Sequence, residues 1–278
     1  MKLFIRQVYY FFYDLFSIIR NCNNDHNFII ITPRILSLLI KKVFIYDKIN
    51  KEILIQYVRD KYDVLTVYEI FSIESYNLKK LKIWKKISDQ YQNYQDQKLT
   101  PLILDCGSNI GSSAEYFQRI FKESYAILIE PEKKNFNFAN KNLSKKNNKL
   151  LNFVISYEEK DYFFDQDFKD SRAAKVTENQ GTKVKSMTID KILNDFPNNK
   201  YQPFLIKIDI EGFENQLFSE NYQWINDFNI IIIEIHDWML PGVANSHNFI
   251  NALNQITNKD NKRDLIISGE NLISIKLD

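Results

Sequence analysis

TPLILDCGSNIGSSAEYF, residues 100–117, is the stretch that decides the fold of this chain of 278 residues. Its apolar run at 102–104 is typical of a strand buried on both faces, and helix-like sequence follows the second glycine. Gly107 and Gly111 permit a tight turn and let a ligand approach bare backbone. The stretch therefore predicts a strand, a ligand-binding glycine loop and a helix.

The spacing of the glycines indicates which ligand this loop binds. A dinucleotide fingerprint needs G-x-G-x-x-G, but Ser108 and Asn109 follow Gly107 and the next glycine is Gly111. A phosphate P-loop needs Gly-Lys-Ser/Thr, and no lysine follows here. The spacing matches D-x-G-x-N-x-G, beginning at Asp105, and resembles motif I of class I S-adenosylmethionine (SAM) methyltransferases. A structural turn in another α/β protein is the alternative.

Composition limits the class of protein. The chain is 45% hydrophobic and 26% charged with a net charge of +2, as expected for a globular protein with one catalytic domain and an appendage. Near-neutral charge provides no field for steering nucleic acid, so we predict no nucleic-acid partner. Cys22 and Cys106 are far apart and show neither disulfide nor zinc spacing, which favours a cytoplasmic location.

The first twenty residues are strongly apolar, but Arg6 and Asp14 interrupt them. The uncharged run is too short to span a bilayer, which takes roughly 20 residues, and no small-residue cleavage site follows it. Apolar residues recur at near-helical spacing. We predict a helix that packs on its own domain or on a second subunit in a homo-oligomer, with peripheral contact to a membrane surface as the alternative.

Three segments with alternating apolar residues predict a small β meander before the glycine loop. They are KVFIYD, EILIQYVR and DVLTVYEIF, at residues 42–47, 52–59 and 63–71. A charged helix and a glutamine-rich connector lead from there to Pro101, and residues 76–84 are expected over the mouth of the cofactor site. The predicted division is a helical and α/β appendage at 1–99 and a catalytic domain at 100–278.

Further strand and helix units follow the glycine loop. YAILIEPE ends a strand at Glu130, one helix-plus-strand unit after Asp105, where an acidic residue can accept both hydroxyls of a ribose. Residues 150–156 predict a third strand, whose end reaches the adenine in this architecture. The polar segment 157–185 is expected to close over the active site, and Thr188 is expected to cap the next helix.

FLIKIDIEGFE and IIIIEIHDW carry the second group of polar residues. Side chains alternate along a strand, so Lys207 and Asp209 share one face. Aligning the strand ends puts Glu234 beside Lys207 and His236 beside Asp209. Lys207 and Glu234 would then be either an ion pair that keeps the interior neutral or part of a functional group. Asp209 and His236 end their strands, where open α/β sheets bind ligands. A hydrogen-bonded structural histidine is the alternative for His236.

Together, LILDCGSNIGSS, IEPE, MTIDKIL, FLIKIDIEGFE and IIIIEIHD resemble the FkbM family of SAM-dependent methyltransferases, over residues 101–278. The resemblance implies a Rossmann-like, seven-stranded, mostly parallel sheet with an antiparallel last strand and helices on both faces. RDLIIS and ENLISIKL, separated by Gly269, predict its final antiparallel pair. Two positions depart from the family pattern: Ser108 stands where alanine is usual, and Cys106 stands where valine or isoleucine is common. The cofactor-binding candidates are Asp105, Gly107, Ser108, Asn109, Gly111, Glu130 and Asp209.

The catalytic candidates are His236, Asp209 and Glu211. An imidazole titrates near neutrality, so His236 is the first candidate for the base, with its tautomer held by Asp209 or Asp237. Direct proton acceptance by Asp209 is the second hypothesis. A divalent ion held by Asp209, His236 and Asp237 is conceivable, but the spacing alone does not establish one, and no metal is predicted.

The resemblance to the FkbM family implies the predicted function, which is O-methylation, with SAM as cofactor, of a hydroxyl on a small-molecule, sugar or glycan acceptor or a secondary metabolite. One alternative is a SAM-binding scaffold subunit without catalysis, and a less favoured one is an N-methyltransferase. Nucleic-acid methyltransferases that modify amino groups carry an Asp/Asn-Pro-Pro-aromatic turn, and this chain has Asp209-Ile210-Glu211-Gly212 there. An acidic turn would also repel phosphates.

Overall fold

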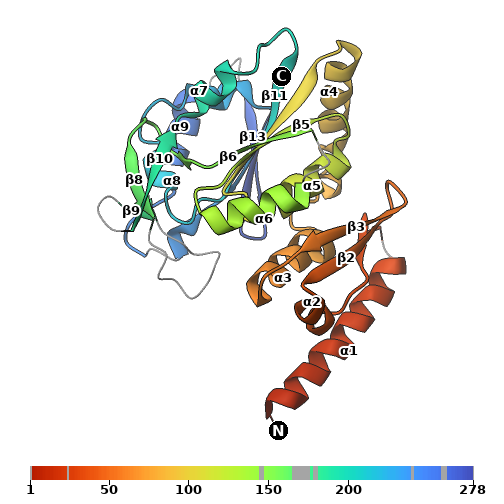
Figure 1. Cartoon of the computed structure of the whole chain (residues 1–278). Coiled ribbons are helices and arrows are strands. Elements are labelled where there is room, and N and C mark those ends of the chain that lie inside the picture. Colours follow the sequence, from red (N-terminus) through yellow and green to blue (C-terminus); the bar gives the residue numbers. More distant parts are fainter. Residues whose placement is uncertain are drawn as a thin grey trace.

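A computed structural model describes residues 2–23, 25–143, 147–164, 176–177, 181–238, 241–257 and 262–277. The main sheet consists of β4 (Thr100–Cys106), β5 (Tyr125–Ile129), β6 (Asn148–Leu151), β11 (Tyr201–Ile208), β12 (Ile230–Glu234), β13 (Arg263–Ser268) and β14 (Asn271–Lys276). The seven strands lie in the order β13-β14-β12-β11-β4-β5-β6 (Figure 1). Strands β6, β5, β4, β11 and β12 are parallel, and β14 is antiparallel to both neighbours. The predicted sheet is confirmed.

Helices cover both faces of this sheet because its strands are apolar on both sides. One face packs against α4 (Trp84–Asp96), α5 (Ser112–Ile120) and α6 (Lys133–Leu143). The other packs against α7 (Ile189–Asn194), α8 (Glu214–Leu217) and α9 (His247–Ile256). Along β11, Leu205 faces the first layer and Ile206 the second. The alternation puts Lys207 on the α5 side, directly under the glycine loop.

The N-terminal segment forms a small three-stranded sheet with its own helices (Figure 1). Its elements are α1 (Lys2–Asn23), β1 (Phe28–Ile30), α2 (Arg34–Ile40), β2 (Lys42–Asp47), β3 (Glu52–Tyr57), α3 (Lys61–Tyr68), the π-helix η1 (Glu69–Ile73) and the 3-10 helix η2 (Leu78–Lys80). The strands predicted at 42–47 and 52–59 are confirmed as β2 and β3.

The strand predicted at 63–71 is wrong, because this segment is α3 followed by η1. Asp60 caps the helix by accepting hydrogen bonds from the backbone N–H groups of Tyr62 and Asp63. Val64, Val67 and Phe71 are buried at helical spacing. The apolar residues of this segment therefore lie on one face of a helix, and the Asp60 N-cap favours the helix over a strand.

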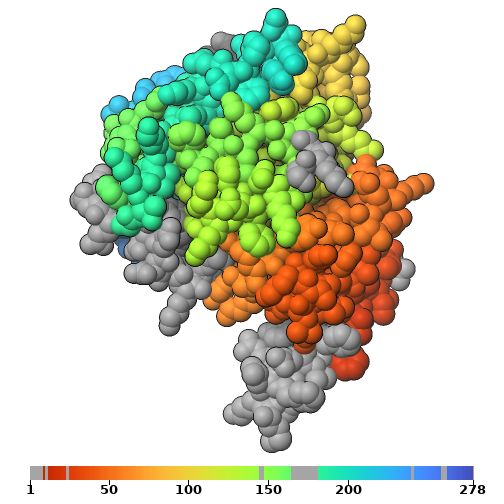
Figure 2. Space-filling view, viewed as in Figure 1, coloured from red at the N-terminus to blue at the C-terminus, as the bar shows by residue number. Residues whose placement is uncertain are grey.

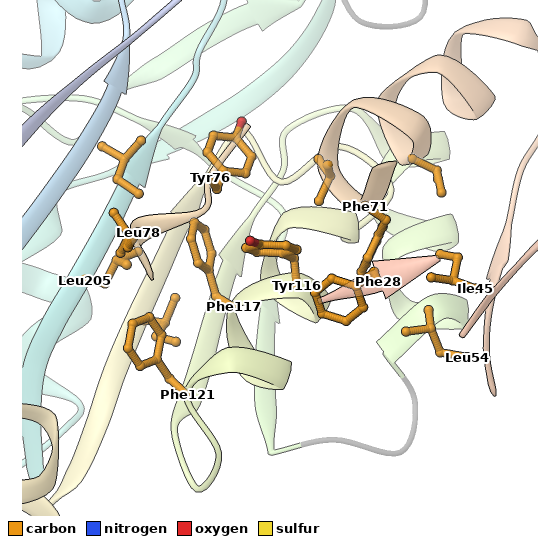
Figure 3. Close-up of a cluster of buried hydrophobic side chains, with 14 of the residues drawn as sticks. Phe28, Ile45, Leu54, Phe71, Tyr76, Leu78, Tyr116, Phe117, Phe121 and Leu205 are labelled. Atoms are coloured by element: carbon orange, nitrogen blue, oxygen red, sulfur yellow. The ribbon is translucent and has the colours of Figure 1, made fainter. Parts of the chain in front are cut away.

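The N-terminal segment shares a hydrophobic core with the main sheet (Figure 3). The rings of Phe28 and Phe71 lie 5.2 and 5.8 Å from that of Tyr116 on α5, and the Tyr76 ring lies 5.5 Å from that of Phe117. Figure 2 shows the orange surface of this segment directly against the yellow-green surface of α6. The division at residue 99 stays a prediction, but the two parts pack as neighbours in one core.

The predicted N-terminal helix is confirmed as α1, which extends away from the rest of the chain (Figure 1). Asp14 is buried and accepts a hydrogen bond of 2.8 Å from the backbone N–H of Arg34, whose side chain also pairs with it. Phe12, Phe16 and Ile19 are largely exposed. Among the helices of the described residues, none is long and apolar enough to cross a membrane.

The strand predicted at 150–156 is divided between two sheets. β6 ends at Leu151, and β7 (Val154–Ile155) joins a second sheet with β8 (Asp161–Phe164), β9 (Val176–Thr177) and β10 (Thr182–Met187). Asn152 turns the chain between them by donating hydrogen bonds to the carbonyls of Glu130 and Pro131. Of the polar segment expected over the active site, residues 165–175 and 178–180 lie outside the described residues.

Candidate functional site

A cavity of about 390 Å³ opens where β4, β5, β11 and β12 end. Parallel strands present their carboxyl ends at one edge, and ligands of open α/β sheets bind there. The glycine loop and Glu130 line one end, which we call the cofactor end. Asp209, Glu211, Glu234 and His236 line the other, which we call the acceptor end. Thr66, Glu69 and Tyr76 add a wall from the N-terminal segment.

Glycine is required at position 107 for two reasons. Its φ is +76°, a left-handed conformation that is costly for other residues. A Cβ there would lie 1.7 Å from the carbonyl oxygen of Asp209, because the loop passes directly against the end of β11. The Gly107 N–H donates to the carbonyl of Ile129. These contacts join the ends of β4, β5 and β11 through bare backbone, and the predicted tight turn is present, but the group that approaches Gly107 is the backbone of Asp209.

Asp105 and Gly111 were expected to bind the cofactor, but neither lines the cavity. Asp105 is fully buried, accepts a 2.5 Å hydrogen bond from Ser113 Oγ, and has its Oδ1 atom 3.4 Å from Lys207 Nζ. Gly111, at φ +84°, allows the start of α5 to approach Ala139 of α6. Both residues support the loop from behind.

Glu130 lies at the cofactor end, held by backbone donors. Its Oε2 accepts from the N–H of Asn109 at 2.8 Å, and its Oε1 accepts from the N–H of Glu132 at 2.9 Å and from the Asn135 side chain at 3.3 Å. Burial raises the pKa of Glu130 to about 7 against these hydrogen bonds. A carboxylate oxygen takes more than one hydrogen bond, so ligand hydroxyls can still donate to it.

Two buried polar atoms of the loop have no hydrogen-bond partner among the described residues: Ser108 Oγ and Asn109 Oδ1. Buried polar groups in proteins are nearly always paired, and both residues line the cavity, where a small rotation of either side chain would bring its oxygen to a bound polar molecule. The N-terminus of α5 lies beside them at Ser112, where free N–H groups favour an anionic group. The cofactor end therefore fits the amino-acid part of SAM.

The predicted contact between Lys207 and Glu234 is wrong. In the observed register Lys207 pairs with Ile232, two residues before Glu234. Lys207 Nζ lies 3.1 Å from Asp209 and 3.4 Å from Asp105, and it donates to the carbonyl of Gly107 at 3.1 Å. Burial alone would lower the pKa of this lysine, but the two carboxylates raise it well above its ordinary value. The lysine joins the loop to β11.

His236 is almost fully buried at the acceptor end, 1% exposed. Its Nε2 lies 3.7 Å from Asp209, as predicted, and also 3.7 Å from Glu211 and 3.6 Å from Glu234. The other ring nitrogen, Nδ1, lies 2.8 Å from Glu214 Oε1. The expected tautomer partners are therefore wrong, because Glu214 takes that position.

Asp237 points elsewhere, since its carboxylate accepts hydrogen bonds from the backbone N–H and the hydroxyl of Ser246. Glu214 is a residue that sequence reasoning missed. It is buried, and Asn245 donates to its second oxygen. Its position three residues after Glu211 is the only signal in the sequence, because its inward orientation at the start of α8 depends on the fold.

The charged groups at the acceptor end shift one another's pKa values. Burial alone lowers the pKa of His236, but Glu214, Asp209 and Glu211 raise it to about 9. Burial and the neighbouring carboxylates raise the pKa of Glu211 to about 8 and that of Glu234 to about 7. Glu211 also has a left-handed φ of +54°, a strained conformation that is concentrated at functional sites.

The sheet order and the site at the strand ends define a class I methyltransferase fold. A profile described as the methyltransferase FkbM domain matches residues 105–260, more than half of the chain. The chain therefore belongs to the FkbM methyltransferase family, and the resemblance found in the sequence motifs is confirmed. No curated protein matches the sequence.

Solved structures with a similar fold include three methyltransferases. A methyltransferase FkbM from Methylobacillus flagellatus is 14% identical with a TM-score of 0.43, over 78% of this chain and 55% of its own. A precorrin-6y C5,15-methyltransferase from Geobacter metallireducens is 10% identical with a TM-score of 0.36, over 68% and 86%. An O-methyltransferase from Bacillus cereus in complex with SAH is 11% identical with a TM-score of 0.38, over 79% and 92%.

Proposed function

We propose that this protein transfers a methyl group from SAM to a hydroxyl of a sugar, a glycan or a secondary metabolite. The observation that carries the proposal is that one cavity joins the glycine loop and Glu130 to a group of carboxylates at the ends of β11 and β12. A cofactor held by the loop would present its methyl group toward those carboxylates. The cavity volume lies within the usual range for small-molecule sites.

The cofactor end supports SAM through three kinds of contact. Glu130 offers its carboxylate to the ribose hydroxyls, and the orphaned oxygens of Ser108 and Asn109 suit the ammonium group of the amino-acid part. Phe153 and Ile155 supply an apolar surface beyond Glu130 for the adenine. Asp105 and Gly111 act indirectly, by holding the loop and α5 in place.

The acceptor end supports a neutral, hydroxyl-bearing acceptor. Four acidic side chains, Glu211, Asp209, Glu234 and Glu270, line it and would repel a phosphate or carboxylate. Trp238 also lines it and is 66% exposed, so its ring offers a flat apolar surface at the mouth. A sugar ring has both an apolar face and hydroxyl groups, and it fits this combination of an aromatic surface with carboxylate acceptors.

Bound SAM supplies an electrophilic methyl carbon on its sulfonium. The residues of the acceptor end would align an acceptor hydroxyl with that carbon, and one of them would take the hydroxyl proton as the methyl group is transferred and S-adenosylhomocysteine is left. We assign the base to Glu211, because its carboxylate is 24% exposed in the cavity and is not paired with Lys207, unlike Asp209. His236, expected first from the sequence, has its Nε2 atom among the carboxylates of Asp209, Glu211 and Glu234, so we assign it to positioning these groups.

Ligand binding and product formation test the proposal. Calorimetry should detect SAM binding and no binding of NAD or ATP. With labelled SAM, a panel of neutral sugars, nucleotide sugars, polyketide alcohols and amines should give label on a hydroxyl, with S-adenosylhomocysteine as the co-product. Binding of NAD but not SAM would overturn the proposal. Binding of SAM with label on nitrogen would restrict it to N-methylation.

The exposed apolar residues of α1 belong to a separate proposal about partners. Asp14 ties the helix to Arg34, but Phe12, Phe16 and Ile19 remain exposed. We propose that this face packs on a second copy of the chain, and deletion of residues 1–20 should then cause loss of the oligomer and aggregation. Flotation of the full chain with liposomes, but not of the shortened chain, would favour a membrane surface.

A further inference from the structure

Asp209, Glu234 and His236 bring three potential metal ligands to one point. Each offers one ligand atom, and these atoms all lie within 4.8 Å of one another. Asp209 directly follows β11, Glu234 ends β12, and His236 begins the 3-10 helix η4 (His236–Trp238). Because β11 and β12 are adjacent and parallel, their ends deliver the side chains to the same edge of the sheet. The group is therefore held by two strands of the main sheet.

The imidazole is oriented as in metal sites. Nδ1 lies 2.8 Å from Glu214 Oε1, so with Nδ1–H donated to that carboxylate, the lone pair of Nε2 points into the cluster. A histidine that donates one N–H to a carboxylate while its other nitrogen binds an ion is the usual arrangement in such sites. Asn245 holds Glu214 from its other oxygen, which fixes this support.

The distances around Nε2 are too long for hydrogen bonds and lie at or just beyond the separation of atoms that bind one ion. Oxygens of Asp209, Glu211 and Glu234 lie 3.7, 3.7 and 3.6 Å from it, beyond hydrogen-bond length. Ligand atoms that bind one ion at roughly 2.0–2.2 Å stand roughly 3–3.6 Å from one another.

The charge balance also calls for a cation. Asp209 uses Oδ2 for Lys207, at 3.1 Å, and turns Oδ1 toward His236. Lys207 is already shared with Asp105, and even with His236 protonated, two positive charges face five carboxyl groups, those of Asp105, Asp209, Glu211, Glu214 and Glu234. Glu69 and Glu270, which line the same cavity, add further negative charge. Glu214 is buried and Asp209, Glu211 and Glu234 are partly buried, and charges withdrawn from water in this way are normally paired or bound to a metal.

We propose that Asp209, Glu234 and His236 bind one divalent cation of the Mn²⁺, Fe²⁺ or Zn²⁺ class, for which mixed carboxylate and imidazole ligands are suited. Its catalytic meaning rests on the proposed function: an acceptor hydroxyl bound to the ion becomes more acidic and gives its proton to Glu211 beside it. The binding itself depends only on residues of this chain.

Mn²⁺ titration of the chelator-treated full chain, without SAM or acceptor, tests the site. Calorimetry should give one ion per chain, and pulsed EPR should detect coupling of Mn²⁺ to an imidazole nitrogen that disappears in His236→Ala. Asp209→Asn and Glu234→Gln should each weaken binding at least about 10-fold, and Glu214→Gln about 10–100-fold, as for other residues that orient a metal ligand. The matched control is Asp237→Asn, next to His236 but bonded to Ser246, which should bind Mn²⁺ like the wild type.

Two outcomes would overturn the site. These are absence of Mn²⁺ and Zn²⁺ binding to a chain that circular dichroism shows to be folded, and loss of affinity in Asp237→Asn equal to that in Asp209→Asn. Unchanged methyl transfer after chelation would overturn the catalytic role of the ion while leaving the proposed function intact. Stoichiometric Mn²⁺ binding with nitrogen coupling in a chain that does not bind SAM would support the site and defeat the proposed function instead.

Discussion

The two ends of the cavity use carboxylates in opposite ways. At the cofactor end, Glu130 receives hydrogen bonds from two backbone N–H groups and an amide, so its position is determined by nearby residues. At the acceptor end, Glu211, Asp209 and Glu234 stand around one imidazole at distances too long for hydrogen bonds. The cofactor end is therefore arranged to receive hydroxyl donors, whereas the acceptor end is arranged to receive positive charge or a proton.

The largest expected effect lies at the acceptor end. Glu211→Gln should lower turnover by about 10²–10⁴-fold, the usual contribution of a positioned base, with the SAM dissociation constant unchanged. Glu220→Gln, on an exposed loop, is the matched control and should keep full turnover. Single-turnover rates with saturating acceptor measure the effect. If His236→Ala abolishes turnover while Glu211→Gln keeps it, the imidazole is the base, and the carboxylates of the acceptor end do not accept the proton.

The next effect concerns the loop that separates the two ends. Gly107→Ala should lower the free energy of unfolding by about 4 kcal/mol or more and abolish SAM binding, because its Cβ would overlap the carbonyl oxygen of Asp209. Gly269→Ala is the control: its φ is also left-handed, at +62°, but nothing lies within 4 Å of its Cβ. It should lose only about 1–2 kcal/mol. Denaturant unfolding compares the variants, and equal losses would show that the close approach is unimportant.

At the cofactor end, Glu130→Ala should weaken SAM binding by about 1–3 kcal/mol, because the ribose hydroxyls lose their acceptor. Turnover at saturating SAM should change little, in contrast to Glu211→Gln. Calorimetry and initial rates measured on the same protein separate the two quantities. A Glu130→Ala variant with normal SAM affinity and reduced turnover would place Glu130 with the reacting groups and would remove the contrast between the ends.

The smallest expected effect is a pH dependence at Glu130. Its pKa is raised from 4.5 to about 7 in the folded chain, mainly by burial with Glu132 nearby. Between these values the folded chain holds a proton that the unfolded chain has released, so the contribution of Glu130 to stability is full below 4.5 and is lost as pH rises through about 7.

The ionised carboxylate accepts hydroxyl donors better than the protonated acid, so SAM affinity should rise a few-fold between about pH 6 and about pH 8. Calorimetry across this range measures the rise, and Glu130→Gln serves as the control because it cannot ionise. The same rise in the variant would assign the pH dependence to another group.

Features that depend on neighbouring residues could be predicted from the sequence. The strand, glycine loop and helix of residues 100–117 appear as predicted, and so does Glu130 after the next strand, because spacing and turn chemistry act over a few residues. The proximity of His236 to Asp209 was also predictable, since both follow the carboxyl ends of adjacent parallel strands, although the assumed register differs from the observed one by two residues. The motifs led to the right family for the same reason.

Tertiary structure determined the strand register, one helix and one side-chain contact that the sequence pattern left ambiguous. The observed register differs by two residues from the expected one, so Lys207 pairs with Asp105 and not with Glu234. Strand pairing is determined by contacts along the whole sheet. The alternating segment at 63–71 became α3 because its apolar face packs on α5 and its N-cap lies outside the alternating run. Glu214 holds His236 only because α8 turns back over the end of β12, a long-range approach that spacing in the chain does not encode.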